Sequence, residues 1–403
     1  HQPEAEEYTD DFYEEQLKPL FGGGDRFHVR TTITGPEEFT FNGVGVKQKD
    51  QTASGHRTVV WESDSPVSFF NVVGGRWKVH KGERSEIYYD VKHDYNVDEI
   101  SEAIDAARAW YSKWFYPYPW RDLRLNEFPN MSTYAQGFAT NITFSEGIGF
   151  LTKDKPGADA PFMVAAHEAA HQWWGNILVP GQGPGGNILS EGMAHFSTGL
   201  LFDQVKGERA RIDFFKLIED QYGNRRSVDS ERPLVKIDGS RDGDTTVTYD
   251  KGGWVFWMLL NHMGRTENLQ GIQSFIRKYS ESSDDYPVLQ DFVNHMRPYA
   301  TDEQAYNEFV NQWFFEVVVP QYEFSNVNLQ RERDQWVVSG KVKNIGTGTM
   351  PLEIAAAVNE RFVDNEPNKN YQDARTTITI GEAETVDFKI RSDFEPDRVL
   401  VDP

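Results

Sequence analysis

The sequence contains no cysteine in 403 residues. This absence excludes disulfide bonds, thiolate metal ligands and a cysteine nucleophile, so any metal must be held by His, Asp or Glu. No apolar run approaches the roughly 18 residues of a membrane-spanning helix. The chain starts with His1 rather than Met and shows no signal-peptide pattern, from which we expect a processed form or part of a longer protein. An extracytoplasmic location or the soluble part of a larger membrane protein fits these features, but zero cysteine also suits the cytosol, so the compartment stays open.

Positive charge is also scarce. The 41 Lys and Arg residues face 63 Asp and Glu residues, and the net charge is −22. Such a surface repels phosphate backbones and anionic lipid headgroups, so we expect no nucleic-acid partner and no binding to a membrane surface. The acidity favours a basic substrate but equally fits a saline habitat, and the sequence does not choose between the two. Aromatic residues make up 14% of the chain, which is typical of a globular protein, and the length predicts two or three domains.

The pattern of the chain predicts a multidomain α+β protein. Residues 1–20 are acidic and form a leader or linker, and residues 21–97 contain short Val, Thr, Phe and Tyr runs typical of a partial N-terminal β-sandwich. Residues 98–320 follow as a mixed and mostly helical domain, with extended segments at 121–152. Residues 321–403 return to alternating strands, which predict a C-terminal immunoglobulin-like β-sandwich. The helices are expected near 98–115, 161–174, 189–205, 209–223, 249–263, 267–281 and 302–316, the second of them ending near Gly175.

The segment PFMVAAHEAAHQWWG, residues 161–175, carries the clearest chemical signal. In a helix capped by Asp159, His167 and His171 lie one turn apart and can hold one metal ion. Glu168 lies beside that point and can take a proton from a metal-activated water. A chance HExxH is expected only about 0.02 times in a chain of this composition. The alternative is an amphipathic core helix whose histidines are hydrogen-bonded and inert.

A third ligand is expected from the next helix. Glu191 lies in the first turn predicted for NILSEGMAHFSTGLLFDQVKG, where it can complete a His, His, Glu site with an open position for water. The alternative is an acidic residue that only favours a helix N-terminus. His195 lies one turn further on, either as an outer contact of the site or as a packed helix-face histidine.

The segments AAHEAAHQWWGN and LSEGMAHF resemble the gluzincin zinc peptidases of family M1, which include the large zinc aminopeptidases and leukotriene hydrolase. Residues 98–120, 247–264 and 267–318 are also similar to segments of that family. The resemblance implies a thermolysin-like catalytic domain within 98–320 and one Zn²⁺ per chain. It also implies that Tyr249 of the VTYDKGG segment donates a hydrogen bond to the oxyanion. A protonated phenol can do this at neutral pH, although one of 17 tyrosines could instead be structural.

Three departures from the family pattern bear on specificity. Nineteen residues separate His171 from Glu191, one more than is usual, and the N-terminal region is short. The third departure concerns the family's Gly-x-Met-Glu-Asn strand, whose Glu holds the substrate's free amine, because the best match here places Thr140 at the Glu position. A hydroxyl cannot make that charge-assisted bond, and Glu146 is a possible substitute. The predicted substrate-binding strand is Gly137, Phe138, Ala139, Thr140 and Asn141.

These features predict zinc-dependent hydrolysis of peptide bonds, with Glu168 and Tyr249 as catalytic residues and a peptide or protein substrate, possibly a basic one. Overall resemblance favours an aminopeptidase, whereas Thr140 favours an endopeptidase or a tail-processing enzyme. A different class of function is a non-catalytic peptide-binding ectodomain of a membrane assembly. The oligomeric state is not indicated by the sequence.

Overall fold

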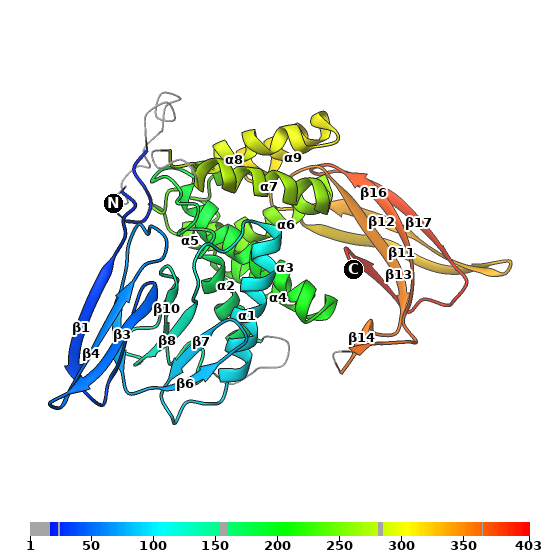
Figure 1. Cartoon of the computed structure of the whole chain (residues 1–403). Helices are drawn as coiled ribbons and strands as arrows, with labels where there is room; N and C mark the ends of the chain where they lie inside the picture. The colour runs from blue at the N-terminus through cyan, green and yellow to red at the C-terminus, as the bar shows by residue number, and fades with distance from the viewer. Residues whose placement is uncertain (1–16, 23–24, 153–158, 281–284, 365) are drawn as a thin grey trace. The chain divides into compact units, whose positions relative to one another are not determined.

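The computed structural model describes residues 17–22, 25–152, 159–280, 285–364 and 366–403 (Figure 1). Most of the predicted acidic leader therefore lies outside the described residues. The chain divides into two compact units, His1–Val310 and Asn311–Pro403. This division falls before the predicted boundary at residue 320, and the finer division at residues 20, 97 and 320 stays a prediction.

The N-terminal part of the first unit is built from strands, as its Val, Thr and aromatic runs predict. Three of them form an antiparallel sheet in the order β1-β4-β3, and two shorter strands pair with each other. Trp61 on β4 is almost fully buried, with the Arg124 guanidinium 4.2 Å from its ring centroid. The strands are β1 (Arg30–Pro36), β2 (Thr40–Gly43), β3 (Val46–Ala53), β4 (His56–Glu62) and β5 (Val72–Gly75).

A five-stranded mixed sheet follows, in the order β6-β7-β8-β10-β9. Strands β8 and β10 run parallel in its centre and are buried, whereas the two-residue strand β9 pairs antiparallel with β10 at one edge. The extended segments predicted in 121–152 are thereby confirmed. The strands are β6 (Lys78–Lys81), β7 (Glu86–Tyr89), β8 (Arg124–Phe128), β9 (Ala135–Gln136) and β10 (Asn141–Ser145).

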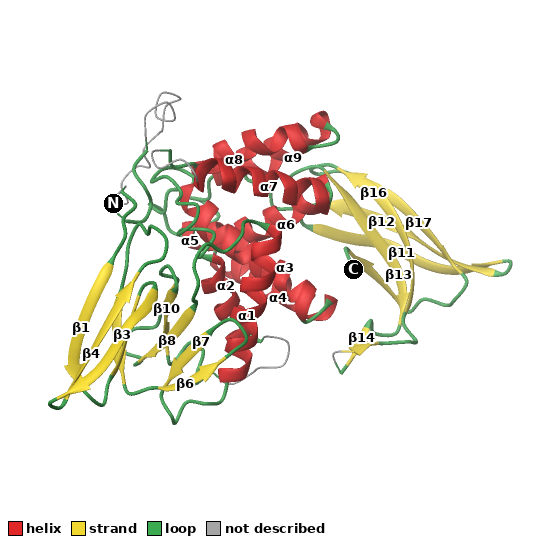
Figure 2. Cartoon of the chain, in the orientation of Figure 1, coloured by secondary structure: helices red, strands yellow, loops and turns green. Residues whose placement is uncertain are grey.

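Most of the α-helices follow these strands along the chain (Figure 2). The first is α1 (Val97–Trp114), whose buried residues Ile100, Ile104, Ala107 and Tyr111 follow the helical period, and it packs against α2. Gly207 and Gly264 have positive φ values of 84° and 92° next to helix ends, as predicted. The other helices are α2 (Ala160–Ala170), α3 (Met193–Val205), α4 (Glu208–Arg225), α5 (Asp244–Thr246), α6 (Gly252–Met263), α7 (Arg265–Ser280), α8 (Leu289–Met296) and α9 (Glu303–Phe315).

The helices differ from the sequence prediction in two respects. Helix α2 ends at Ala170 instead of Gly175, and helices α5 and α8 were not expected. In the part of the chain that the structure describes, no helix has both the length and the apolarity needed to cross a bilayer.

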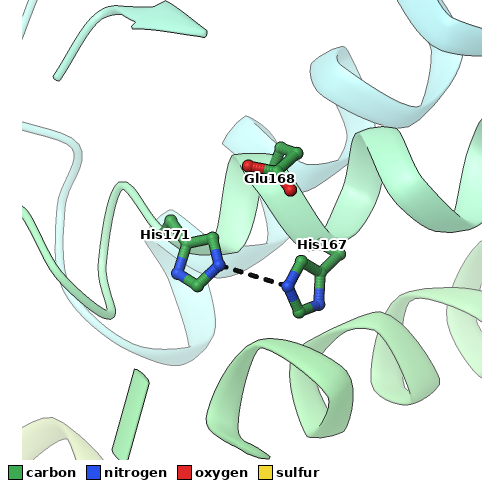
Figure 3. A group of neighbouring side chains, drawn as sticks. All are labelled: His167, Glu168 and His171. Atoms are coloured by element: carbon green, nitrogen blue, oxygen red, sulfur yellow. Dashed lines mark hydrogen bonds between the residues drawn. The ribbon is translucent and has the colours of Figure 1, made fainter. Parts of the chain in front are cut away.

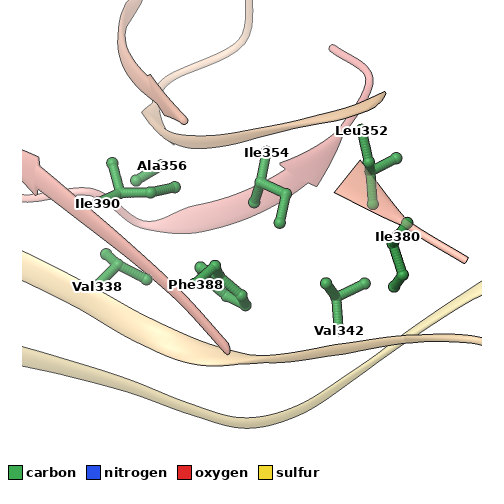
Figure 4. Close-up of a cluster of buried hydrophobic side chains, with 8 residues drawn as sticks. All are labelled: Val338, Val342, Leu352, Ile354, Ala356, Ile380, Phe388 and Ile390. Atoms are coloured by element: carbon green, nitrogen blue, oxygen red, sulfur yellow. The ribbon is translucent and has the colours of Figure 1, made fainter. Parts of the chain in front are cut away.

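The second unit contains two three-stranded antiparallel sheets, ordered β11-β12-β17 and β16-β13-β18. Side chains from both sheets share one buried cluster (Figure 4), namely Val338, Val342, Phe388 and Ile390 from the first and Leu352, Ile354, Ala356 and Ile380 from the second. The predicted strands are confirmed, and an immunoglobulin-like topology stays a prediction. The strands are β11 (Tyr322–Glu332), β12 (Gln335–Asn344), β13 (Met350–Val358), β14 (Phe362–Val363), β15 (Glu366–Pro367), β16 (Gln372–Ile380), β17 (Thr385–Ser392) and β18 (Arg398–Val401).

Candidate active site

Helix α2 carries the HExxH segment, and local sequence explains where it starts and stops. The Asp159 side chain accepts a hydrogen bond from the Phe162 backbone N–H at 3.1 Å, as an N-cap does. At the other end, Gln172 bonds back to the carbonyl of Ala169 in a tight turn. This turn carries the Trp174 carbonyl to 3.0 Å from Nδ1 of His171. The early end of the helix therefore fixes one of the two imidazoles.

The side chains of His167, His171 and Glu191 converge on one point. Nε2 of His167 and Nε2 of His171 lie 3.2 Å apart, and Oε2 of Glu191 lies 3.1 Å from the first and 3.2 Å from the second. Figure 3 shows the two imidazoles turned toward one another, with Glu168 beside them on the same helix. A tetrahedral metal bound at about 2.1 Å holds its ligand atoms about 3.4 Å apart. The three atoms are close to that spacing, so the donor set fits zinc.

The charges in the site are coupled. Burial of the Glu191 carboxylate opposes its ionisation, but the neighbouring imidazoles outweigh burial and hold the pKa of Glu191 well below its usual range. Burial likewise opposes the charge on His171, but Glu191 outweighs it and raises the pKa of His171 to about 9. An ionised carboxylate between two imidazoles is an arrangement that attracts a cation.

Glu168 is placed for proton transfer. A carboxylate oxygen of Glu168 lies within 4.8 Å of the imidazole nitrogens. Within the described residues, its buried Oε2 has no hydrogen-bond partner. Burial raises the pKa of Glu168 above its usual value, which brings a carboxylate closer to the range of an effective general base.

Tyr249 approaches the same point from another element. Its ring is stacked on that of His167, with centroids 5.8 Å apart. Burial, followed by the nearby Glu191 carboxylate, raises the pKa of the Tyr249 phenol, which therefore stays protonated. Tyr249 lies in the π-helical turn Val247–Lys251, and Glu191 lies in a second such turn, Ile188–Gly192. Single π turns recur at functional sites, and the sequence period does not reveal them.

These groups open into one cavity of about 370 Å³. It is lined by Phe21, Phe69, Tyr134, Ala135, Gln136, Gly137, Ile148, Met163, Val164, His167, Glu168, His171, Trp174, Gly175, Asn176, Glu191, His195 and Tyr249. Strand β9 thus forms part of the wall. Gly137, directly after it, packs so closely on α2 that a Cβ there would lie 2.7 Å from the Glu168 carbonyl oxygen.

Most of the predicted substrate-binding strand lies away from the cavity wall, and its role in substrate binding stays a prediction. Of residues 137–141, only Gly137 lines the cavity. Thr140 has a positive φ of 62° that turns the chain into β10, and it is fully buried. Its hydroxyl accepts a hydrogen bond from the backbone N–H of Gly45 at 2.8 Å, so it does not face a substrate. Phe138, Ala139 and Asn141 are likewise absent from the cavity wall.

Glu146, the predicted substitute anchor, belongs to a different cluster. Its Oε1 accepts a hydrogen bond from the Asn130 backbone N–H at 3.0 Å, and its Oε2 lies 3.6 Å from Nδ1 of His93. It does not line the cavity. His195, by contrast, does line it and contacts His167, so the outer-contact prediction for His195 is supported.

Comparison with known proteins agrees with this geometry. The model of the peptidase family M1 domain matches residues 95–313. Aminopeptidase N of Haemonchus contortus is 26% identical over 187 residues, which are 43% of this chain and 19% of that protein. Human endoplasmic reticulum aminopeptidase 2 is 28% identical over 179 residues, 42% of this chain and 18% of that protein. The chain thus spans about a fifth of the length of these relatives.

Two solved structures share the fold. Legionella pneumophila aminopeptidase A, in complex with aspartic acid, gives a TM-score of 0.61 at 17% identity, covering 91% of this chain and 42% of that one. An M1 zinc metallopeptidase from Deinococcus radiodurans gives a TM-score of 0.55 at 18% identity. The match covers 72% of this chain and 64% of that one. Since the family model covers more than half of the 403 residues, the chain belongs to peptidase family M1.

Proposed function

We propose that this chain hydrolyses peptide bonds with a zinc ion held by His167, His171 and Glu191. The observation that carries the proposal is the convergence of their three ligand atoms within 3.2 Å of one another at a cavity that Glu168 and Tyr249 also line. When bound, zinc supplies Lewis-acid polarisation of the scissile carbonyl and of the attacking water.

Two residues of the chain transfer the proton and stabilise the developing charge. Glu168 accepts a proton from water as the water oxygen attacks the carbonyl carbon, and it returns that proton to the amine nitrogen as the C–N bond breaks. Tyr249 donates a hydrogen bond to the carbonyl oxygen, where negative charge develops. The two products are a carboxylate and an amine, and no covalent intermediate with the protein is needed.

The end-specificity is a separate question. The named relatives are aminopeptidases, which favours removal of N-terminal residues. Among the described residues that line the cavity, however, the only carboxylates are Glu168 and Glu191, and both already have roles. No further described carboxylate there can anchor a free amine, which favours an endopeptidase or a tail-processing enzyme. Turnover of one peptide, with a free and with an acetylated N-terminus, distinguishes the two specificities. Equal turnover of both forms would exclude an aminopeptidase.

A non-catalytic, peptide-binding ectodomain is the candidate from another class. A binding module has no use for a buried general base, and Glu168 is retained beside the ligand set. The net charge of −22 supports a preference for basic peptides in either case.

The decisive variant is Glu168→Gln, which keeps the shape of the side chain and removes its basicity. We expect it to bind zinc as the wild type does and to cleave a mixed peptide library about 10²- to 10⁴-fold more slowly. Glu37→Gln, at an exposed position in the loop between β1 and β2, is the matched control and should behave as wild type. Equal cleavage by the wild type and Glu168→Gln would remove the proposed mechanism.

A further inference from the structure

The second nitrogen of His167 does not face solvent or a backbone carbonyl, but another histidine. Nδ1 of His167 lies 2.9 Å from Nδ1 of His195, and both side chains are at least four-fifths buried. We propose that His195 acts as a positioning residue that holds His167 in its metal-binding tautomer. This proposal rests on the proposed function, because it takes His167 to be a zinc ligand.

The hydrogen-bond pattern allows one assignment of the protons. If Nε2 of His167 binds zinc, its Nδ1 carries the hydrogen and must donate it. Nδ1 of His195 is then the acceptor, which leaves the hydrogen of His195 on Nε2. That nitrogen lies 3.7 Å from Oδ1 of Asp250, which is longer than a hydrogen bond. The direct outer contact of His167 is therefore the imidazole of His195.

His195 and the neighbouring Asp250 are held in place by the residues around them. His195 is four residues after Glu191, so the helix that supplies the third ligand also supplies the outer contact. The Asp250 carboxylate accepts a hydrogen bond from Thr246 at 2.5 Å. Helix α6 can approach only because residue 253 is glycine, since a Cβ there would lie 2.8 Å from Cβ of His195.

The two zinc-binding histidines are therefore oriented by different means. Nδ1 of His171 lies 3.0 Å from the Trp174 carbonyl oxygen, in the turn after α2, and 3.3 Å from the Ser190 hydroxyl, in the π turn Ile188–Gly192. Nδ1 of His167 has only a side-chain partner among the described residues, namely His195. Substitution at residue 195 can thus remove the outer contact of one ligand and leave the other intact.

The test measures zinc affinity rather than turnover. Zinc is titrated into the metal-free protein in competition with a chelating dye, for wild type, His195→Phe, His195→Asn and His262→Phe. His262 is an exposed histidine on α6, bonded to the Ala305 carbonyl oxygen, and serves as the control. We expect His195→Phe to weaken zinc binding about 10- to 100-fold. His195→Asn should restore most of the affinity, because its amide oxygen can accept the hydrogen bond from His167.

Two further readouts separate positioning from folding. Thermal unfolding of the metal-free variants shows whether His195→Phe is folded, and the visible spectrum of the Co²⁺ form reports ligand geometry, which should change in His195→Phe and not in His262→Phe. Wild-type zinc affinity in a folded His195→Phe, or equal weakness of the Phe and Asn variants, overturns the positioning role and leaves the proposed function standing. If the wild type itself binds no zinc, that result refutes the proposed function, and the positioning role with it.

Discussion

The π turn that carries Tyr249 is anchored by a buried ion pair whose two members should respond unequally to substitution. Nζ of Lys251 lies 2.7 Å from Oε1 of Glu231, and their side chains are 6% and 1% exposed. Glu231 also accepts a hydrogen bond from the Tyr222 hydroxyl at 2.7 Å and pairs with Nε of Arg226 at 2.8 Å. Lys251 has no second ion-pair partner in the described chain. Burial lowers the pKa of Lys251 even with Glu231 beside it, so its charge is the less well compensated.

Because Lys251 has one counter-charge and Glu231 has several partners, the two substitutions should lower the free energy of unfolding by different amounts. Glu231→Gln leaves the Lys251 ammonium buried without a counter-charge, which should lower the free energy of unfolding by about 3–5 kcal/mol. Lys251→Met leaves Glu231 with Tyr222 and Arg226, so the loss should be nearer 1–2 kcal/mol, the scale of a single charged hydrogen bond.

Urea unfolding followed by tryptophan fluorescence measures both values. Nine of the 11 tryptophans precede residue 311, so the signal reports mainly the first unit. Lys236→Met, at an exposed position, is the control and should stay within about 0.5 kcal/mol of wild type. Equal losses for Glu231→Gln and Lys251→Met, or a larger loss for Lys251→Met, would refute the reasoning.

Three more outcomes follow from the structure. Tyr249→Phe should lower kcat about 10²- to 10³-fold with zinc affinity unchanged, and steady-state kinetics with unaltered kcat would remove Tyr249 from the mechanism. Ion pairs with Lys251 and Arg226 outweigh burial and lower the pKa of Glu231, so its stabilisation is complete above the unfolded value of about 4.3 and is lost as pH falls through the folded value. The stability gap between wild type and Glu231→Gln should therefore narrow in acid, and a gap that is constant from pH 7 to pH 3 contradicts this. Asp159→Ala removes the N-cap of α2 and should cost about 1 kcal/mol in urea unfolding, whereas an unchanged midpoint would show that the cap is not needed.

The sequence predicts those parts of the site whose geometry depends on residue spacing within one helix. The four-residue spacing of His167 and His171 places both imidazoles on one face of any helix, and Glu191 enters at the start of the next one. The role of Tyr249 came only from its resemblance to a family segment, because no local pattern links residue 249 to residue 167. Their ring contact depends on how the intervening helices pack.

Other features could not be predicted from local patterns. The match of residues 137–141 to the family's Gly-x-Met-Glu-Asn strand rests on resemblance alone. Pairing with β8 places Asn141 inside the sheet, and of these five residues only Gly137 lines the cavity. The early end of α2 depends on the turn that buries both Trp173 and Trp174. Helix α8 has only 8 residues and gives too short a pattern to recognise.

Zinc stoichiometry tests the account most directly. The purified wild type and Glu191→Gln are each saturated with zinc, dialysed against metal-free buffer and measured by inductively coupled plasma mass spectrometry. The account predicts that the wild type retains one zinc ion per chain and that Glu191→Gln, with its third ligand neutralised, retains far less. Loss of zinc from the wild type, or full retention by Glu191→Gln, would contradict a metal centre built from His167, His171 and Glu191.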